Sequence, residues 1–268
     1  MVAHTDPFPA VAGQGIARLR TAGIEVVLAD DTTAQRFKDL NIGFLSRVER
    51  GRPWVRMKIA ASLDGRTALN DGRSQWITGS EARIDGHLWR KRAGAILTGI
   101  GTVLADDPRL DVRLVVTDLQ PVRVIVDSAM RTPPTARIVE APGRCLVVAA
   151  AQASEREAAL RSAGAEVLHL PGNDGQVDLA ALTKYLASAG VNELHVEAGS
   201  RLNGELLRAR LVDELIVYLA PMFVGPGRTM ADLAGLESLD NAAEFRFYDV
   251  QHTGSDLRLQ LRRLVEDA

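Results

Sequence analysis

A lysine among small residues is the first candidate for chemistry in this sequence. Residues 55–62 alternate in polarity, so that Lys58, Ala60 and Ser62 share one side of a predicted strand. Small residues beside a lysine leave room for a ligand. Glycine-containing turns at 64–65 and 70–72 predict that the polar stretch 74–78 folds back as a loop over this open face. An ordinary edge hairpin explains the same pattern equally well.

A carboxylate is the second candidate. Glu197 closes the predicted buried strand 193–196, and burying a carboxylate there is costly unless it is paired, which favours a functional role over a helix cap or a surface ion pair. Gly199 permits a tight turn, and Ser200 is expected to cap a helix that runs to residue 208, so that backbone N–H groups face a ligand. Gly99, Gly101 and Thr102 form a similar pattern, which a plain strand-to-helix turn also explains.

The elements that must position these groups alternate between strands and helices. Helices are predicted at 15–22, 32–49, 80–92, 153–163, 179–189 and 200–208, and strands at 24–28, 57–61, 95–97, 122–127, 146–149, 166–170, 193–196 and 213–221. Segments 245–252 and 256–264 are predicted to form an antiparallel terminal hairpin. The pattern predicts a three-layer α/β domain with a mostly parallel central sheet. Ligands of such sheets bind beyond the carboxyl ends of the strands, where Gly99, Ser128 and Glu197 are expected to converge.

Composition excludes several classes of function. The 268 residues are 46% hydrophobic and 25% charged with a net charge of −2, which is ordinary for a soluble protein and argues against nucleic acid or an anionic membrane as partner. Cys145 is the single cysteine, so a disulfide framework and a thiolate metal cluster are excluded. The five histidines lack ligand spacing, and we expect no metal. Because we find neither a membrane-spanning run nor a leader pattern, we expect a cytoplasmic location.

Several motifs taken together resemble one known family. They are MKIAASLDGRTA, SQWIT, AILTGIGTVLADDPRLDVR, VIVDS, VEAGSRLNGELL and LVDELIVYLAP. In this order, from residue 54 to the C-terminus, they resemble the reductase domain of the bifunctional riboflavin-biosynthesis pyrimidine deaminase/reductase. The resemblance implies a fold like that of dihydrofolate reductase, a homodimer, and a reaction in which NADPH reduces the ribosyl group of 5-amino-6-(5-phosphoribosylamino)uracil to a ribityl group.

The resemblance also implies a set of site residues. The residues expected at the nucleotide are Ala60, Trp76, Thr102, Asp106, Ser128, Gly199, Ser200, Arg201, Leu202 and Asn203. Those expected at the substrate are Ser74, Arg90, Leu110, Arg113 and Glu197. Two arginines suit a 5′-phosphate, because a guanidinium group binds phosphate through two parallel hydrogen bonds. Lys58 is expected to polarise or protonate the C1′ oxygen or nitrogen, and Glu197 to orient the ribose hydroxyls or pass a proton.

The N-terminal part departs from a reductase pattern. Residues 1–50 resemble the closing elements and linker helix of the deaminase half, and residues 51–268 are expected to form the reductase domain. The zinc signature H-A-E with its downstream P-C-x-x-C is absent, so deaminase activity is not expected. Two origins fit this pattern: a piece of a bifunctional protein, or a separate reductase that kept the tail as packing.

Other functions and the oligomeric state complete the predictions. A dihydrofolate-reductase-like enzyme acting on another pterin or pyrimidine, and a non-catalytic partner of a deaminase, are the alternative functions. Strand 215–219 and the terminal hairpin are expected to leave a sheet edge open, which a homodimer would cover.

Overall fold

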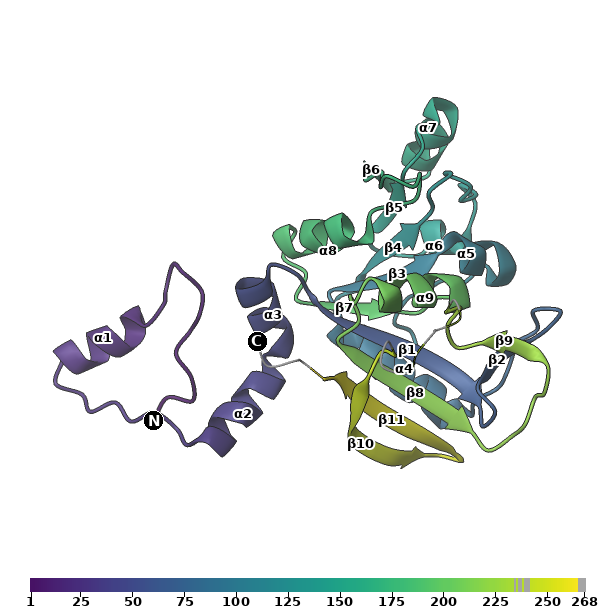
Figure 1. The fold of residues 1–268 in the computed structure, drawn as a ribbon. Coiled ribbons are helices and arrows are strands. Elements are labelled where there is room, and N and C mark those ends of the chain that lie inside the picture. The colour runs from purple at the N-terminus through teal and green to yellow at the C-terminus, as the bar shows by residue number, and fades with distance from the viewer. Residues whose placement is uncertain (234, 236–237, 239–241, 265–268) are drawn as a thin grey trace. The chain divides into compact units, whose positions relative to one another are not determined.

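A single large sheet organises the molecule. The structure, a computed structural model, describes residues 1–233, 235, 238 and 242–264. Nine of its strands form one sheet in the order β10-β11-β8-β1-β7-β3-β4-β5-β6 (Figure 1). Their bounds are β1 Trp54–Ser62, β3 Ala95–Gly99, β4 Val122–Val126, β5 Cys145–Ala149, β6 Glu166–His169, β7 Glu193–Val196, β8 Glu214–Ala220, β10 Phe245–Thr253 and β11 Asp256–Arg263.

The sheet is mostly parallel, with an antiparallel C-terminal end. β1 pairs in parallel with β8, and β3 pairs in parallel with both β4 and β7, as β5 does with β4 and β6. β10 and β11 form an antiparallel hairpin whose second strand continues the sheet beside β8. The predicted α/β fold class is therefore confirmed.

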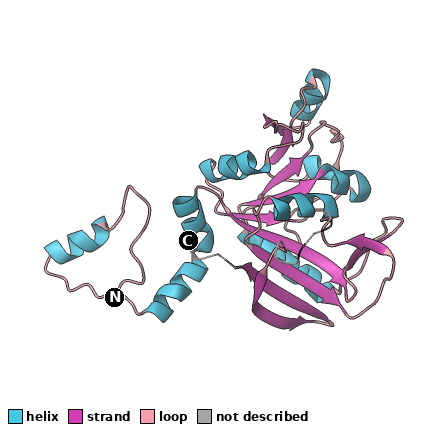
Figure 2. Cartoon of the chain, in the orientation of Figure 1, coloured by secondary structure: helices cyan, strands magenta, loops and turns pink. Residues whose placement is uncertain are grey.

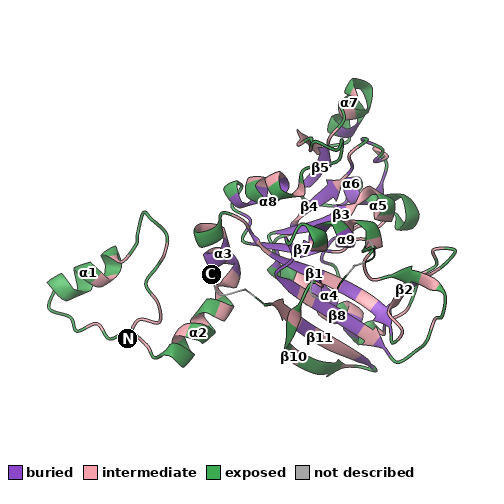
Figure 3. Ribbon diagram, viewed as in Figure 1, coloured by how far each residue is buried: buried purple, intermediate pink, exposed green. Residues whose placement is uncertain are grey.

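Helices cover both faces of this sheet. Their bounds are α4 Ser80–Arg92, α5 Ile100–Asp106, α6 Arg137–Glu140, α7 Ser154–Ser162, α8 Leu179–Ser188 and α9 Ser200–Arg208. Figure 1 shows α9 on one face of the sheet and α4 on the other. The central strands are largely buried, as Figure 3 shows. In β1, for example, Val55 and Met57 are completely buried, as a strand in the middle of a covered sheet requires.

Two predictions about strand neighbours were wrong. β1 lies between β8 and β7, so the edge-hairpin interpretation fails, and β2 (Arg66–Leu69) pairs instead with β9 (Gly227–Thr229) in a separate two-stranded sheet. Gly227 is needed in that pair, because a Cβ there would lie 2.3 Å from the carbonyl oxygen of Ala68. β8 is internal as well, since β11 covers it, whereas the terminal hairpin does leave an open edge, at β10.

Helix boundaries also differ from the prediction. The expected caps Ser80 and Ser200 are the first helical residues, and Gly79 and Gly199 take the N-cap positions with no side-chain cap from the described residues. The expected helix 32–49 is two helices, α2 (Asp31–Leu40) and α3 (Ile42–Arg50). They separate at Asn41, whose Nδ2 donates to the carbonyl oxygen of Phe37 at 3.0 Å. Segment 24–28 forms only an isolated bridge, between Val2 and Leu28.

The chain divides into two compact units. One comprises Met1–Trp54 with Thr183–Asn192, and the other comprises Val55–Leu182 with the described residues from Glu193 onward. The first unit contains α1 (Gln14–Thr21), α2 and α3, drawn in cyan in Figure 2. Every residue of α1 and α2 is at least partly exposed. The helices of the described chain are all too short or too polar to cross a membrane.

Candidate active site

The predicted lysine and carboxylate lie on neighbouring strands. Lys58 is half-buried on β1, and Glu197 directly follows β7, where its N–H donates to the carbonyl oxygen of Leu97 at 2.9 Å. The Lys58 ammonium lies 5.7 Å from the ring centroid of Tyr218. Burial lowers the pKa of Lys58, and the nearby Glu197 carboxylate partly opposes this shift. A lysine whose pKa is lowered gives up its proton more readily, which suits a proton donor.

Glu197 is held by a bidentate pair with Arg90 of α4. The guanidinium Nε and Nη2 donate to Oε1 and Oε2 at 2.5 and 2.8 Å. Burial opposes the charge on Glu197, but Arg90 and then His195 and Lys58 outweigh it and hold the pKa of Glu197 well below its usual range. Glu197 is therefore ionised at neutral pH, in a fixed orientation.

A second polar network begins at Tyr218, the residue whose ring lies beside the Lys58 ammonium. Tyr218 is completely buried on β8, and its hydroxyl donates to Oδ2 of Asp85 at 2.5 Å. Arg258 of β11 donates to the same oxygen at 3.1 Å. Because Ala60 is the register partner of Tyr218 on β1, the small residue beside Lys58 lies next to this ring.

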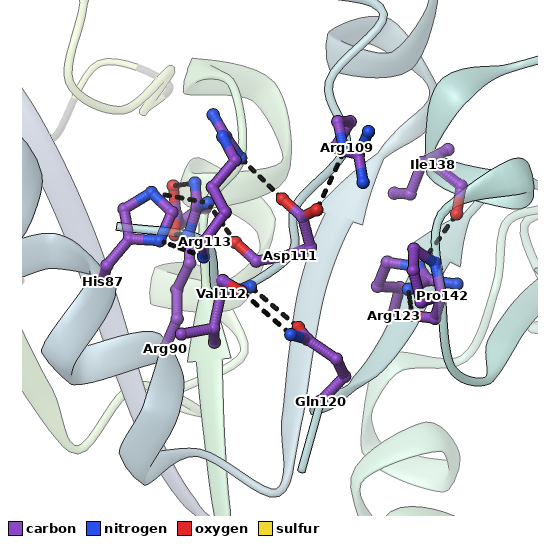
Figure 4. A network of polar contacts seen from close by, with 11 residues as sticks. His87, Arg90, Arg109, Asp111, Val112, Arg113, Gln120, Arg123, Ile138 and Pro142 are labelled. Carbon is purple, nitrogen blue, oxygen red and sulfur yellow. Dashed lines mark hydrogen bonds and ion pairs between the residues drawn. The ribbon is translucent and has the colours of Figure 1, made fainter. Parts of the chain in front are cut away.

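A segment rich in arginine extends the site beyond Glu197 (Figure 4). Asp111 accepts from Arg113 Nη1 at 2.6 Å and from Arg109 Nε at 2.8 Å, and its carbonyl oxygen accepts from Arg90 Nη1 at 2.9 Å. Burial opposes the charge of Asp111, but Arg113 and Arg109 outweigh it and lower its pKa. The buried side chain of Leu110 precedes Asp111 in the left-handed region, with φ of 48°.

The starts of two helices meet on the other side of the strand ends. A Cβ added to Gly199 would lie 3.7 Å from Thr102 Oγ1 of α5, and one added to Gly99 would lie 3.2 Å from Leu202 Cδ2 of α9. The glycines allow the two loops to approach closely. The N-terminus of α9 thus offers backbone N–H groups beside a threonine hydroxyl, an arrangement suited to phosphate.

A model of the RibD C-terminal domain family matches residues 53–259. The chain belongs to the RibD C-terminal domain family. It is 42% identical over 269 residues to the riboflavin biosynthesis protein RibD of Escherichia coli (strain K12), with 96% of this chain and 72% of the relative covered. The predicted family resemblance is confirmed.

Solved structures show the same relationship. RibD of Acinetobacter baumannii, form 1, matches with a TM-score of 0.85 at 38% sequence identity. The match covers 98% of this chain and 72% of the Acinetobacter chain. A Thermotoga maritima protein matches with a TM-score of 0.81 at 26% sequence identity, over 97% of this chain and 69% of the Thermotoga chain. That protein is described as a diaminohydroxyphosphoribosylaminopyrimidine deaminase/5-amino-6-(5-phosphoribosylamino)uracil reductase.

In this RibD C-terminal domain, the predicted site residues fall into separate groups. Lys58, Arg90 and Glu197 lie together, and Asp111 connects Arg90 to Arg113. The remaining predicted residues lie on other elements. Thr102, Gly199, Ser200, Arg201 and Leu202 lie at or near the starts of α5 and α9, Asp106 ends α5, Ser128 follows β4, and Ser74 and Trp76 lie in the loop after β2.

Three of these residues have partners within the RibD domain itself. Asn203 is buried, and its Nδ2 donates to the carbonyl oxygen of Met230 at 2.8 Å. Ser128 Oγ accepts from the N–H of Val177 at 3.1 Å. The Trp76 ring is 65% exposed and carries the Arg83 guanidinium 4.6 Å from its centroid. Their roles toward a nucleotide stay predictions.

Sequence reasoning missed two buried histidines of this domain. His87 Nδ1 accepts from the N–H of Arg113 at 3.1 Å, and His195 Nε2 lies 3.3 Å from Glu197 Oε1. His195 shares a strand face with Glu197, two residues away, which was a usable clue. Among the described residues, no group of three or more His, Cys, Asp or Glu gathers closely enough to hold a metal ion.

Proposed function

We propose that this chain reduces the ribosyl group of 5-amino-6-(5-phosphoribosylamino)uracil to a ribityl group, as a reductase of riboflavin biosynthesis. Family membership and the name of the Thermotoga maritima relative support this substrate. The observation that carries the proposal is the cluster of Lys58 in the middle of β1, Glu197 at the carboxyl end of β7 and Arg90 on α4, continued by Arg113. It combines a proton donor, an ionised carboxylate and phosphate-binding groups.

Each side chain has a distinct task in this reaction. Arg113 is about half exposed, and on binding it releases its ion pair with Asp111 and binds the 5′-phosphate of the substrate instead. Glu197 orients the ribose hydroxyls, because Arg90 leaves lone pairs on its oxygens available. Lys58 protonates the sugar oxygen or amine nitrogen as C1′ accepts hydride, so that one hydride and one proton are added to the substrate.

The cofactor in this proposal is NADPH, which supplies the hydride when bound. The close approach of Gly199 to Thr102 and the start of α9 fit its pyrophosphate. Ala60 and Trp76 are proposed to contact the nicotinamide half. For the 2′-phosphate we propose Arg131, which lines an open pocket of about 490 Å³ directly after β4 together with Arg156 and Glu155.

Three further predictions are part of this proposal. Residues 1–50 are proposed to be a deaminase-derived tail, residues 51–268 the reductase domain, and the cytoplasm the site of activity. The homodimer is proposed to form through β10, the edge strand, on which Phe247 and Val250 are 67% and 52% exposed. A single species at monomer mass in light scattering would reject the dimer.

Cofactor titration followed by turnover tests the proposal. Calorimetry of the folded chain with NADPH and with NADH should give heat with both and tighter binding of NADPH. Arg131→Ala should reduce the ratio of the NADH and NADPH dissociation constants, whereas Arg137→Ala should leave this ratio unchanged. Consumption of NADPH should then depend on the phosphoribosylamino-pyrimidine. A folded chain that gives no heat with either cofactor would reject the enzyme altogether.

A further inference from the structure

Residues 110–112 are buried without belonging to any helix or strand, and the exposed Arg113 follows them. Asp111 and Val112 are each only 4% exposed, and Leu110 lies in the left-handed backbone region. Buried backbone N–H and C=O groups need hydrogen-bond partners, and a strand would take them from its neighbours in a sheet. Here side chains provide them, and the identity of these side chains indicates what the segment does (Figure 4).

The side chain of Gln120 makes the hydrogen bonds to the backbone of Val112 that a neighbouring strand would otherwise make. Its Oε1 accepts from the N–H of Val112 at 2.8 Å, and its Nε2 donates to the carbonyl oxygen of Val112, also at 2.8 Å. These two hydrogen bonds from one amide side chain satisfy both the N–H and the C=O of Val112 and fix the plane in which they lie. Val112 is therefore held in an extended conformation although no strand pairs with it among the described residues.

His87 of α4 holds the next residue. Its Nδ1 accepts from the N–H of Arg113 at 3.1 Å, and its Nε2 lies 3.5 Å from Nη1 of Arg90. The charged groups around the ring are Arg90 on α4, Arg113 and Asp111 on the segment, and Glu197 after β7. Burial, and then the two arginines, lower the pKa of His87 to about 4. A ring that stays neutral is an acceptor for Arg113, and it is not a proton donor at neutral pH.

The consequence concerns the arginine side chain. With its backbone fixed, Arg113 reaches Asp111 at 2.6 Å, and the carbonyl oxygen of Asp111 accepts from Arg90 at 2.9 Å. We propose that His87 and Gln120 are positioning residues that hold segment 110–113 in the conformation that binds the sugar phosphate. This inference rests on the proposed function, because it assigns the phosphate to Arg113.

Paired substitutions at His87 test the inference. His87→Leu removes the acceptor and leaves the Arg113 N–H without a partner, so the KM for the phosphorylated substrate should rise about tenfold while kcat is unchanged. The Kd of ribose 5-phosphate should rise by the same factor in calorimetry with the NADPH-loaded enzyme. His87→Asn places an amide oxygen where Nδ1 stood and should restore both values. NADPH affinity should be the same in all three proteins.

The outcomes separate cleanly. A folded His87→Leu enzyme with the original KM and Kd, a lower kcat at unchanged KM, or an Asn variant as impaired as the Leu variant would each overturn the inference. If His87→Leu does not fold, Gln120→Leu decides, since the same rise in KM supports the inference and an unchanged KM rejects it. A parent enzyme that binds NADPH but neither binds ribose 5-phosphate nor turns over removes the proposed function, and the inference with it.

Discussion

Replacing Lys58 by methionine is the sharpest test of the proposed chemistry. Methionine keeps the length and apolar stem of lysine but cannot donate a proton, so turnover should fall by about 10²- to 10⁴-fold, the usual contribution of a general acid. The structure predicts little cost in stability. Glu197 keeps its bidentate partner Arg90 at 2.5 and 2.8 Å, so no charge is left uncompensated, and the ammonium removed belongs to a half-buried residue. The free energy of unfolding should change by less than about 1 kcal/mol.

Three measurements belong to this test. Nicotinamide absorbance gives turnover, calorimetry gives the NADPH affinity, and thermal unfolding gives stability. Lys91→Met, on an exposed residue of the same helix as Arg90, is the matched control and should behave as the parent does. Unchanged turnover in folded Lys58→Met would refute its role as proton donor. A loss of NADPH affinity of similar size would show that Lys58 binds the cofactor instead.

Three other perturbations have defined outcomes. Gly204→Ala should destabilise the chain by about 1–3 kcal/mol in thermal unfolding, because the Cβ would lie 2.1 Å from the carbonyl oxygen of Asp232, whereas Gly86→Ala, where a Cβ meets open space, should not. Arg90→Lys cannot form both parallel bonds to Glu197 and should cost about 1–3 kcal/mol in urea unfolding, so an unchanged midpoint would contradict the pair. The depressed pKa of His87, about 4 against 6.5 in the unfolded chain, means that the unfolded chain takes up the proton first. Stability should therefore fall as the pH drops from 6.5 towards 4, by up to about 3 kcal/mol relative to His87→Asn; equal pH profiles would contradict this.

The sequence was informative where one periodicity extends along an element. The alternation around Lys58 predicted β1, and the short strand before Glu197 predicted β7. The parallel-sheet rule then predicted that Gly99, Ser128 and Glu197 lie at carboxyl ends of strands. β10 and β11 followed from a short turn between two alternating segments. In each case the information is local, because side-chain direction along a strand depends only on neighbouring positions.

The sequence was uninformative where distant residues meet. The pairing of β2 with β9 joins segments more than 150 residues apart through a three-residue strand, too short for any periodicity. His87 contacts the backbone of Arg113 across 26 positions, and a histidine on a helix has no feature that predicts such a bond. The serines at 80 and 200 suggested caps, but each is the first helical residue and the preceding glycine is the N-cap. At Gly79 the backbone N–H donates to the carboxylate of Asp256, 177 positions away, which no local pattern predicts.

The two halves of the site differ in how they are built, and this has a consequence for engineering. Lys58 and Glu197 project from strands inside a covered sheet, whereas Arg113 lies on a stretch tied down by two side chains. The exposed Arg113 and its neighbouring side chains can therefore be redesigned, together with the two ties, while the strands, the buried Leu110 and the Asp111 carbonyl that holds Arg90 are left untouched. New anionic substrates should be obtainable from libraries confined to this stretch, without loss of the hydride-transfer step.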